Sequence, residues 1–389
     1  MEEIYLDNAA TTMCYKEAAK KIEKYLLYDY ANASAVHKKG FEAGKILKET
    51  KDNLLDFLNI KENRRVIFTS GATESVNMAI KGTIGKIKHP ENINIITTNI
   101  EHPCVTNVFH YYEDLNVKTK YVPVDKNGVI NLEELVNSID KNTKLISIIY
   151  VNNEFGVVQD VEKIIKKVKE KNENVLVHID ATQAVGKVDL KLKDADMISL
   201  SAHKFHGPKG IGALVLKENI TLLPLLHGGG QQESYRSGTI NTPLIAGLDE
   251  AVKITKKNFE ENKKIFKDLF LYTVSKLSSE IKDYHINTPY EKADISYHIL
   301  NVSFKGIKGE VLLHMLEEDN IYVSVSSACS SRNTTVNSIL KAIDVDDDLI
   351  NGTIRISFSE FNTKEQIDVF ITKLKENLER LHLLNKMSR

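Results

Sequence analysis

Short apolar runs alternate with longer amphipathic stretches along the first half of the chain, and this alternation limits the possible folds. The apolar runs are five to seven residues long and rich in β-branched residues, which is typical of strands buried on both faces. The runs span residues 65–69, 93–97, 145–151, 175–179 and 211–216. The stretches between them, such as 132–139 and 161–171, are rich in Lys and Glu. The pattern predicts an α/β domain with a mostly parallel sheet, which binds ligands beyond the carboxyl ends of its strands.

The last third of the chain has a different pattern. A long polar helical stretch from about Leu248 to Leu277 carries no strand signal, and we interpret it as a connector. Strand-like pieces at 299–304 and 353–358 then flank a helical stretch at 309–318. We therefore expect a second, smaller α+β domain.

Composition and charge narrow the class of protein. Of the 389 residues, 42% are hydrophobic and 27% charged, as in ordinary folded proteins. The 52 basic and 53 acidic residues leave a net charge of -1, which gives no electrostatic reason for nucleic acid or an anionic membrane as partner. No apolar run approaches the ~20 residues that cross a bilayer, and the acidic start at 1–7 is unlike a signal peptide. We expect a cytoplasmic protein.

The cysteines and histidines give no metal signal. Three cysteines (Cys14, Cys104 and Cys329) are too few for a disulfide scaffold, and the chain has no CxxC pair. His203 and His206 have no third ligand nearby in the sequence. We predict no metal site.

Polar residues follow the predicted strands. Gly71, Ala72 and Thr73 open a helix after the first strand, where free N–H groups and the helix dipole suit a phosphate. Taken alone, a plain helix cap is the more common explanation of such residues. His102 follows the second strand, a position where a single histidine is more often structural. Asn153 follows the third, where its amide is placed to meet a ligand.

Asp180 and Lys204 are the most suggestive of these residues. Asp180 ends an apolar strand, and a buried carboxylate is costly unless a cation pairs with it. Most lysines in such a chain are solvated, but Lys204 follows an apolar strand and lies between His203 and His206. An amine in such a setting can have its pKa lowered enough to form a Schiff base.

The second half adds three further candidates. The glycine run 228–230 has no GxSxG partner that would indicate a lipase, so it predicts a tight loop leading to a possible phosphate contact at 236–239. Cys329 lies among small polar residues, which favours a reactive thiol over a buried structural one. Arg355 interrupts an apolar strand and could clamp a carboxylate through two parallel hydrogen bonds.

Taken in order, these motifs resemble the cysteine desulfurase family, in the class V aminotransferase group of fold-type I pyridoxal-phosphate enzymes. The resemblance extends from Tyr5 to Arg355. Six motifs carry it: Thr69–Glu74, Asn152–Gly156, His178–Gln183, Ser201–Lys204, Arg236–Thr239 and Ser327–Cys329. It implies an N-terminal segment (1–15) that packs with the small domain, a large cofactor-binding domain (16–250), and a connector helix with the small domain (251–389).

The resemblance also implies a role for each candidate. Pyridoxal 5'-phosphate would be linked to Lys204, with its phosphate bound by Ala72, Thr73, Ser201 and His203. Thr239 would reach the phosphate in the neighbouring subunit, which implies a homodimer. His102 would stack on the cofactor ring, Asp180 would pair with its nitrogen and Gln183 would bond its hydroxyl. Asn153 and Arg355 would orient the substrate carboxylate.

The implied reaction converts L-cysteine to L-alanine. Lys204 would remove the α-proton, and the Cys329 thiolate would attack the substrate sulfur and hold it as a persulfide. The Ser-rich setting of Cys329 resembles the branch with a long mobile cysteine loop, which hands sulfur to iron–sulfur scaffold or tRNA-thiolation proteins.

Three positions depart from the family pattern. Ala33 replaces the usual Pro, Gln232 a common Glu, and Ser326 the Gly before Ser-Ala-Cys. They leave the predicted cofactor site intact and bear on rate, loop reach and choice of partner.

Two alternatives stay open at this point. One is another reaction of the same cofactor on this fold, such as selenocysteine or cystine lyase activity or transamination. The other is a non-catalytic paralogue that binds a sulfur-transfer partner. Transamination has no need of Cys329, so its substitution separates the first alternative from a desulfurase.

Overall fold

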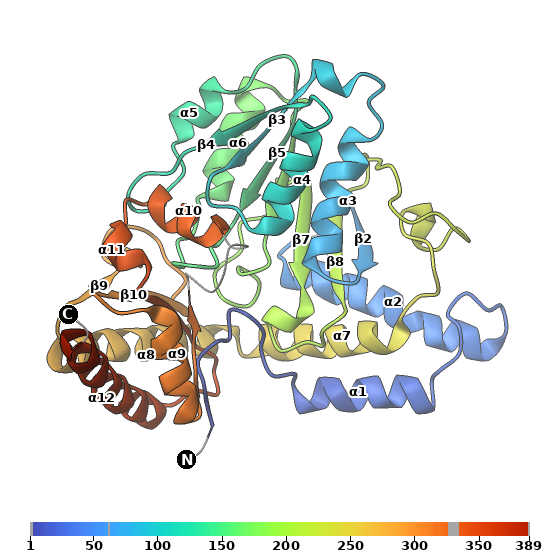
Figure 1. Ribbon diagram of the computed structural model, residues 1–389. Helices are drawn as coiled ribbons and strands as arrows, with labels where there is room; N and C mark the ends of the chain where they lie inside the picture. The colour runs from blue at the N-terminus through green and yellow to red at the C-terminus, as the bar shows by residue number, and fades with distance from the viewer. Residues whose placement is uncertain (1–2, 61–62, 326–333, 388–389) are drawn as a thin grey trace.

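A seven-stranded sheet forms the centre of the larger part of the molecule (Figure 1). The computed structural model describes residues 3–60, 63–325 and 334–387. In order across the sheet the strands are β2 (Arg64–Thr69), β8 (Gly212–Lys217), β7 (Met197–Ser201), β6 (Leu176–Asp180), β5 (Thr143–Ile149), β3 (Asn94–Thr98) and β4 (Lys118–Val122). All run in one direction except β8, which is antiparallel to both of its neighbours. The predicted α/β fold with a mostly parallel sheet is confirmed.

Helices cover both faces of this sheet because successive strand residues point to opposite sides. Ile95 and Ile96 of β3 belong to different buried clusters. Ile95 packs in the cluster of α3 (Ala72–Ile84) and α4 (Pro103–Glu113), and Ile96 in that of α6 and α7. The helices of this part are α1 (Lys16–Leu27), α2 (Lys38–Phe57), α3, α4, α5 (Leu132–Asn137), α6 (Val161–Lys171) and α7 (Thr242–Lys257). Within the described ranges, no helix is long and apolar enough to span a membrane.

A four-stranded antiparallel sheet builds the smaller part. Its order is β12 (Ser324–Val325), β13 (Thr353–Ser357), β10 (Ile299–Phe304) and β9 (Tyr284–Ile286). The helices of this part are α8 (Phe259–Glu280), α9 (Gly309–Glu318), α10 (Thr334–Ala342), α11 (Asp347–Ile350) and α12 (Lys364–Met387).

The N-terminal segment joins the smaller part through its backbone. Strand β1 (Ile4–Tyr5) pairs in parallel with β11 (Ile321–Tyr322), and Asp7 forms a bridge with Ser357. The division at 15/16 and 250/251 stays a prediction, and its second boundary falls within α7.

The connector differs from the single helix predicted from about Leu248 to Leu277. Two helices, α7 and α8, meet at Asn258, which has φ −99° and ψ 7° and belongs to neither. Asparagine favours helix ends because its side chain competes for backbone hydrogen bonds. The break lets α7 pack on α1 and α2 of the larger part while α8 packs on α12 of the smaller part (Figure 1).

Candidate functional site

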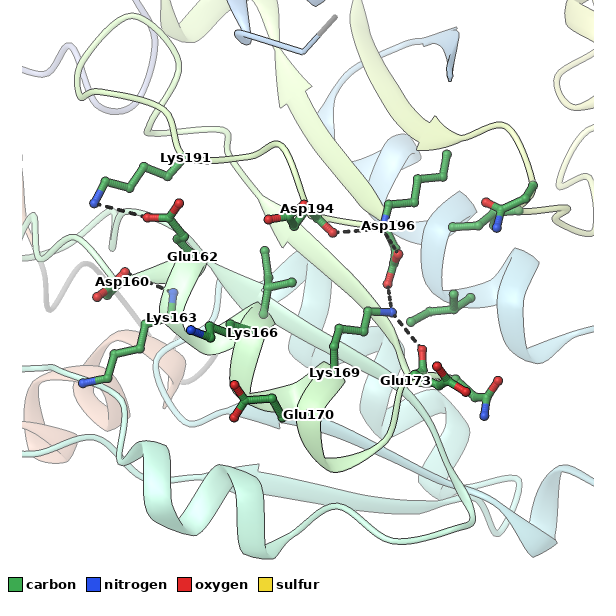
Figure 2. A pocket seen from close by; sticks show the side chains of 16 residues that line it. Asp160, Glu162, Lys163, Lys166, Lys169, Glu170, Glu173, Lys191, Asp194 and Asp196 are labelled. Carbon is green, nitrogen blue, oxygen red and sulfur yellow. Dashed lines mark hydrogen bonds and ion pairs between the residues drawn. The ribbon is translucent and has the colours of Figure 1, made fainter. Parts of the chain in front are cut away.

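A hollow of about 1230 Å³ lies at the amino-terminal edge of the sheet beside α6 (Figure 2). Several of its charged groups are engaged with one another. Lys169 and Lys217 contact the two oxygens of Asp196 at 2.6 and 2.7 Å, and Lys191 lies 3.6 Å from Glu162. Because parallel sheets bind ligands at the opposite, carboxyl-terminal edge, this hollow does not suit the predicted chemistry.

A second hollow, of about 760 Å³, opens at the carboxyl ends of β2, β5, β6 and β7. It brings together ten of the residues predicted from the sequence: Ala72, Thr73, His102, Asn153, Asp180, Gln183, Ser201, His203, Lys204 and Arg355. Thr239 is exposed and is not among the described residues that line it. Cys329 lies outside the described residues. We take this hollow as the candidate active site.

Lys204 lies in the short turn that follows β7, with its amine inside the pocket. Its Nζ donates hydrogen bonds to the carbonyl oxygens of Ala9 (2.6 Å) and Ala10 (2.9 Å). Burial, together with the nearby charge of Arg355, lowers the pKa of Lys204 to about 8. A useful fraction of the amine is therefore unprotonated near neutral pH, as a nucleophile or base requires.

Asp180 ends β6 and is 3% exposed. Its Oδ1 accepts hydrogen bonds from Thr182 N at 3.1 Å and from Ser199 Oγ at 3.4 Å. Behind it, His178 lies between the hydroxyls of Ser199 (3.0 Å) and Ser147 (2.8 Å), and burial lowers the pKa of His178 to about 4. A buried carboxylate surrounded by neutral donors fits a protonated ring nitrogen of a ligand.

Two histidines that border the pocket are neutral near pH 7. His102 caps α4 by accepting a hydrogen bond from Cys104 N at 3.1 Å, and burial lowers its pKa. His203 contacts Thr11 Oγ1 at 3.1 Å, and burial lowers its pKa to about 4, with Lys204 contributing. Both imidazoles thus offer an aromatic surface and a hydrogen bond rather than a positive charge.

The start of α3 is left open toward the pocket. Its N-cap, Gly71, forms no side-chain cap hydrogen bond, and Ala72 and Thr73 begin the helix. Ser201 Oγ lies 3.4 Å from the position that a Cβ on Gly71 would take, so the hydroxyl lies close to this helix end. Backbone N–H groups, a helix dipole and a hydroxyl together fit a phosphate group.

Arg355 on β13 contacts two carboxylates that the sequence analysis did not assign to the site. Its Nη1 donates to Asn153 O at 2.9 Å and to Glu154 Oε1 at 3.1 Å, and its Nη2 donates to Asp7 Oδ1 at 3.1 Å. Arg355 Nε and Asn153 Oδ1 are buried without a hydrogen-bond partner among the described residues. These two atoms leave capacity for a small polar substrate.

Comparison with known proteins decides the family. The model of the family described as aminotransferase class-V matches residues 4–370. The chain belongs to this family. The match extends over nearly the whole chain, so it covers both sheets and every residue predicted for the site.

Curated relatives define the branch of the family. "Cysteine desulfurase IscS" of Plasmodium falciparum (isolate 3D7) is 38% identical over 100% of this chain and 70% of its own. "Cysteine desulfurase IscS" of Buchnera aphidicola subsp. Baizongia pistaciae is 38% identical over 99% of this chain and 95% of its own. These relatives confirm the prediction of a cysteine desulfurase of the class V group, whose cofactor is pyridoxal 5'-phosphate.

Solved structures agree with this placement. A chain titled "NIFS-LIKE PROTEIN" superimposes with a TM-score of 0.91 at 37% identity, over 98% of this chain and 100% of its own. One titled "SspA in complex with cysteine" gives a TM-score of 0.75 at 31% identity, over 92% and 100%. The predicted fold class is confirmed by both.

Proposed function

We propose that this chain takes sulfur from L-cysteine, releases L-alanine and keeps the sulfur as a persulfide on Cys329. The convergence of Lys204, Asp180 and Arg355 on one pocket carries the proposal. These residues supply an amine of lowered pKa, a buried carboxylate and a carboxylate-binding guanidinium. The pyridoxal cofactor, when bound, supplies the electron sink for charge that develops at the substrate α-carbon.

Two groups of pocket residues bind the cofactor, one at its phosphate end and one at its ring end. The N–H groups at Ala72 and Thr73, with Ser201 and His203, hold the phosphate end in this proposal. At the ring end, Asp180 pairs with the nitrogen, Gln183 bonds the hydroxyl oxygen and His102 stacks on the ring. The groups at the phosphate end and Gln183 donate to oxygens, Asp180 accepts from the ring nitrogen, and His102 offers an aromatic surface.

Lys204 and Arg355 act on the substrate. The unprotonated amine of Lys204 takes the α-proton of cysteine as a general base. Arg355 and the amide of Asn153 bind the substrate carboxylate, which fixes the α-carbon near the amine. The carboxylate can only accept, so this assignment uses Arg355 Nε, which lacks a partner in the described structure, and an N–H of Asn153 Nδ2, which also donates to Glu154 Oε1 at 2.7 Å.

Cys329 accepts the sulfur in this proposal. The thiolate bonds to the substrate sulfur while the carbon–sulfur bond breaks, and the carbon gains a proton to give the methyl group of alanine. Val325, which lines the pocket, precedes Cys329 by four residues, and four residues span at most about 14 Å. The chain length therefore allows the thiol to reach the substrate.

We also propose a cytoplasmic homodimer that hands its sulfur to an acceptor protein, either an iron–sulfur scaffold or a tRNA-thiolation enzyme. A patch of exposed apolar side chains near the α1–α2 connection supports an interface; it contains Leu26, Leu27, Tyr28, Tyr30, Val36 and Phe41. The exposed position of Thr239 outside its own pocket suits a role in the site of a second copy.

The decisive experiment follows alanine and sulfur together. The cofactor-loaded protein is incubated with L-cysteine, alanine is quantified, and the Cys329 peptide is examined by mass spectrometry for an added sulfur. We expect both signals in the parent and neither in Cys329→Ala.

Cys104→Ala is the matched control, because Cys104 lines the same pocket but burial raises its thiol pKa well above the usual value. It should keep the added sulfur on Cys329. Alanine release that survives Cys329→Ala would instead identify a lyase without a protein persulfide.

A further inference from the structure

His298 belongs to the smaller part of the molecule, yet its ring reaches the wall of the pocket. It directly precedes β10 and is fully buried. Its Nε2 lies 3.3 Å from Oε1 of Gln183, a pocket-lining residue, and its Nδ1 lies 2.5 Å from Ser296 Oγ. Both ring nitrogens are thus engaged, and one of them acts on a residue of the candidate site.

The chemistry of the neighbours fixes which atom donates in each contact. The carbonyl of Ala9 can only accept, so the contact at 2.8 Å is a donation from Gln183 Nε2. The carbonyl oxygen of the Gln183 amide consequently faces His298, which must donate from a protonated Nε2. The neutral ring then presents its Nδ1 lone pair to the hydroxyl of Ser296.

Backbone pairing between the two parts holds His298 in this position. Ser296 N donates to Gly156 O at 2.7 Å, and Val158 N donates to Asp294 O at 2.8 Å. Gly156 has φ +76°, and a Cβ there would lie 3.2 Å from Ser296 O, so glycine suits this close approach. The segment before β10 is therefore fixed on the loop that carries Asn153.

Burial and the charges around His298 keep its ring neutral. Burial and three nearby cations, Lys187, Arg355 and Lys204, hold the pKa of His298 well below its ordinary value. The ring also packs beside Phe266, with centroids 6.2 Å apart. The same tautomer is therefore present across the neutral pH range.

We propose that His298 is a positioning residue that fixes the amide of Gln183, so that its second N–H donates to the hydroxyl oxygen of the cofactor ring. The inference rests on the proposed function, because it needs the cofactor in this pocket. Without His298 only the contact with Ala9 O, among those that the structure describes, holds the Gln183 amide, and a rotated amide would turn its carbonyl oxygen toward the ring oxygen of the cofactor. The smaller part of the molecule thereby tunes the charge on the cofactor from outside the pocket.

The pH titration of the visible absorption band of the loaded protein tests this proposal. The ring oxygen carries more negative charge after the cofactor loses its proton, so losing a donor raises the pH midpoint. We expect His298→Asn, which keeps the contact with Ser296 but does not reach Gln183, to raise the midpoint by about 0.5–1 pH unit. His298→Gln, whose amide extends to the Nε2 position, should restore the parent midpoint.

Gln183→Leu provides the test that His298 acts through Gln183. It should raise the midpoint similarly, and adding His298→Asn to it should cause no further shift. Should His298→Asn fail to fold, His298→Phe serves instead, because its ring occupies similar space but offers no donor to Gln183 Oε1. An upward shift with His298→Phe is then the expected result.

An unchanged midpoint in His298→Asn, or in His298→Phe where that variant is used, would overturn the proposal. Equal losses of thermal stability in His298→Asn and His298→Gln, with parent midpoints in both, would show a purely structural role. If the parent protein takes up cofactor and releases alanine, but the variants have the same midpoint as the parent, only this inference is refuted. A parent protein that takes up no cofactor refutes the proposed function as well.

Discussion

Arg355 on β13 donates a hydrogen bond to Asp7 at 3.1 Å, although the two residues are 348 positions apart in the sequence. The carboxylate of Glu154 lies 3.1 Å from the other terminal nitrogen of the same guanidinium. One cation is thus placed between two carboxylates. They hold the guanidinium in place, but their charge opposes the binding of a substrate carboxylate.

Asp7→Asn separates these two effects. The amide keeps an oxygen acceptor for Arg355 and removes one negative charge, so the KM for cysteine should fall by about two- to five-fold with little change in kcat. Asp7→Ala removes the acceptor as well, and its KM should rise. Steady-state alanine release measures both, and a rise in KM for Asp7→Asn would show that the charge of Asp7 aids substrate binding.

The lowered pKa of Lys204 predicts how the cofactor-free protein takes up its cofactor. The unprotonated amine is the nucleophile, so the rate of cofactor uptake should rise with pH and level off above about pH 8. With an ordinary lysine, whose pKa is 10.5, the rate would keep rising to about that pH. Stopped-flow absorbance measures this rate.

Lys209, which lines the same pocket, offers a matched comparison for this prediction. Lys209→Met should still give a linkage that borohydride reduction makes permanent, and Lys204→Met should give none. A permanent linkage in Lys204→Met would assign the amine to another residue.

Glu101 predicts a dependence of stability on pH. Its Oε1 accepts from Thr98 Oγ1 at 2.6 Å and Ile149 N at 3.0 Å, but burial raises its pKa to about 8. A carboxyl pKa that is higher in the folded state means that folding favours the protonated form. Its contribution to stability is complete below about pH 4.5 and is lost as pH rises through 8.

Glu101→Gln removes this titration and keeps an acceptor oxygen. Between pH 5 and 8 the free energy of unfolding of the parent should fall relative to the variant, by at most about 1.4 kcal/mol per pH unit. Urea unfolding of both proteins across this range measures the difference. Parallel pH profiles would contradict the raised pKa of Glu101.

The sequence predicted the sheet and most of the pocket because both depend on local patterns. Strand β10 and helix α9 begin and end where their patterns predict. Asp180 is the last residue of its strand, and Lys204 lies three residues after the end of its own. Parallel topology then brings the ends of these strands to one edge, which places the polar residues together.

The contacts around Arg355 and Gln183 could not be predicted in the same way. Asp7 and His298 reach them from distant segments, 348 and 115 positions away, and nothing local marks either as part of the site. Edge strand β4 was also missed, because Lys118 and Lys120 are exposed and interrupt any apolar run. The break at Asn258 depends on which helices α7 and α8 pack against, which is a tertiary effect.

Gln232, one of the departures from the family pattern, joins a surface loop to the edge strand β2. Its Oε1 accepts from Phe68 N at 2.6 Å, and its Nε2 donates to Phe68 O at 2.9 Å. Gln232, Glu233 and Ser234 all have left-handed backbone angles, with φ of 50°, 58° and 65°. Such a run costs of the order of 1 kcal/mol per residue, and the paired hydrogen bonds offset part of that cost.

Gln232→Glu should therefore destabilise the protein, although it installs the residue common in the family. A carboxylate can accept from Phe68 N but cannot donate to Phe68 O, and it places two oxygens against each other. We expect the free energy of unfolding to fall by about 1–3 kcal/mol. Glu233→Gln is the matched control, because it breaks an exposed ion pair with Arg65 and should cost less than about 1 kcal/mol. Equal stabilities of the two variants would mean that the Gln232 contacts do not hold the loop.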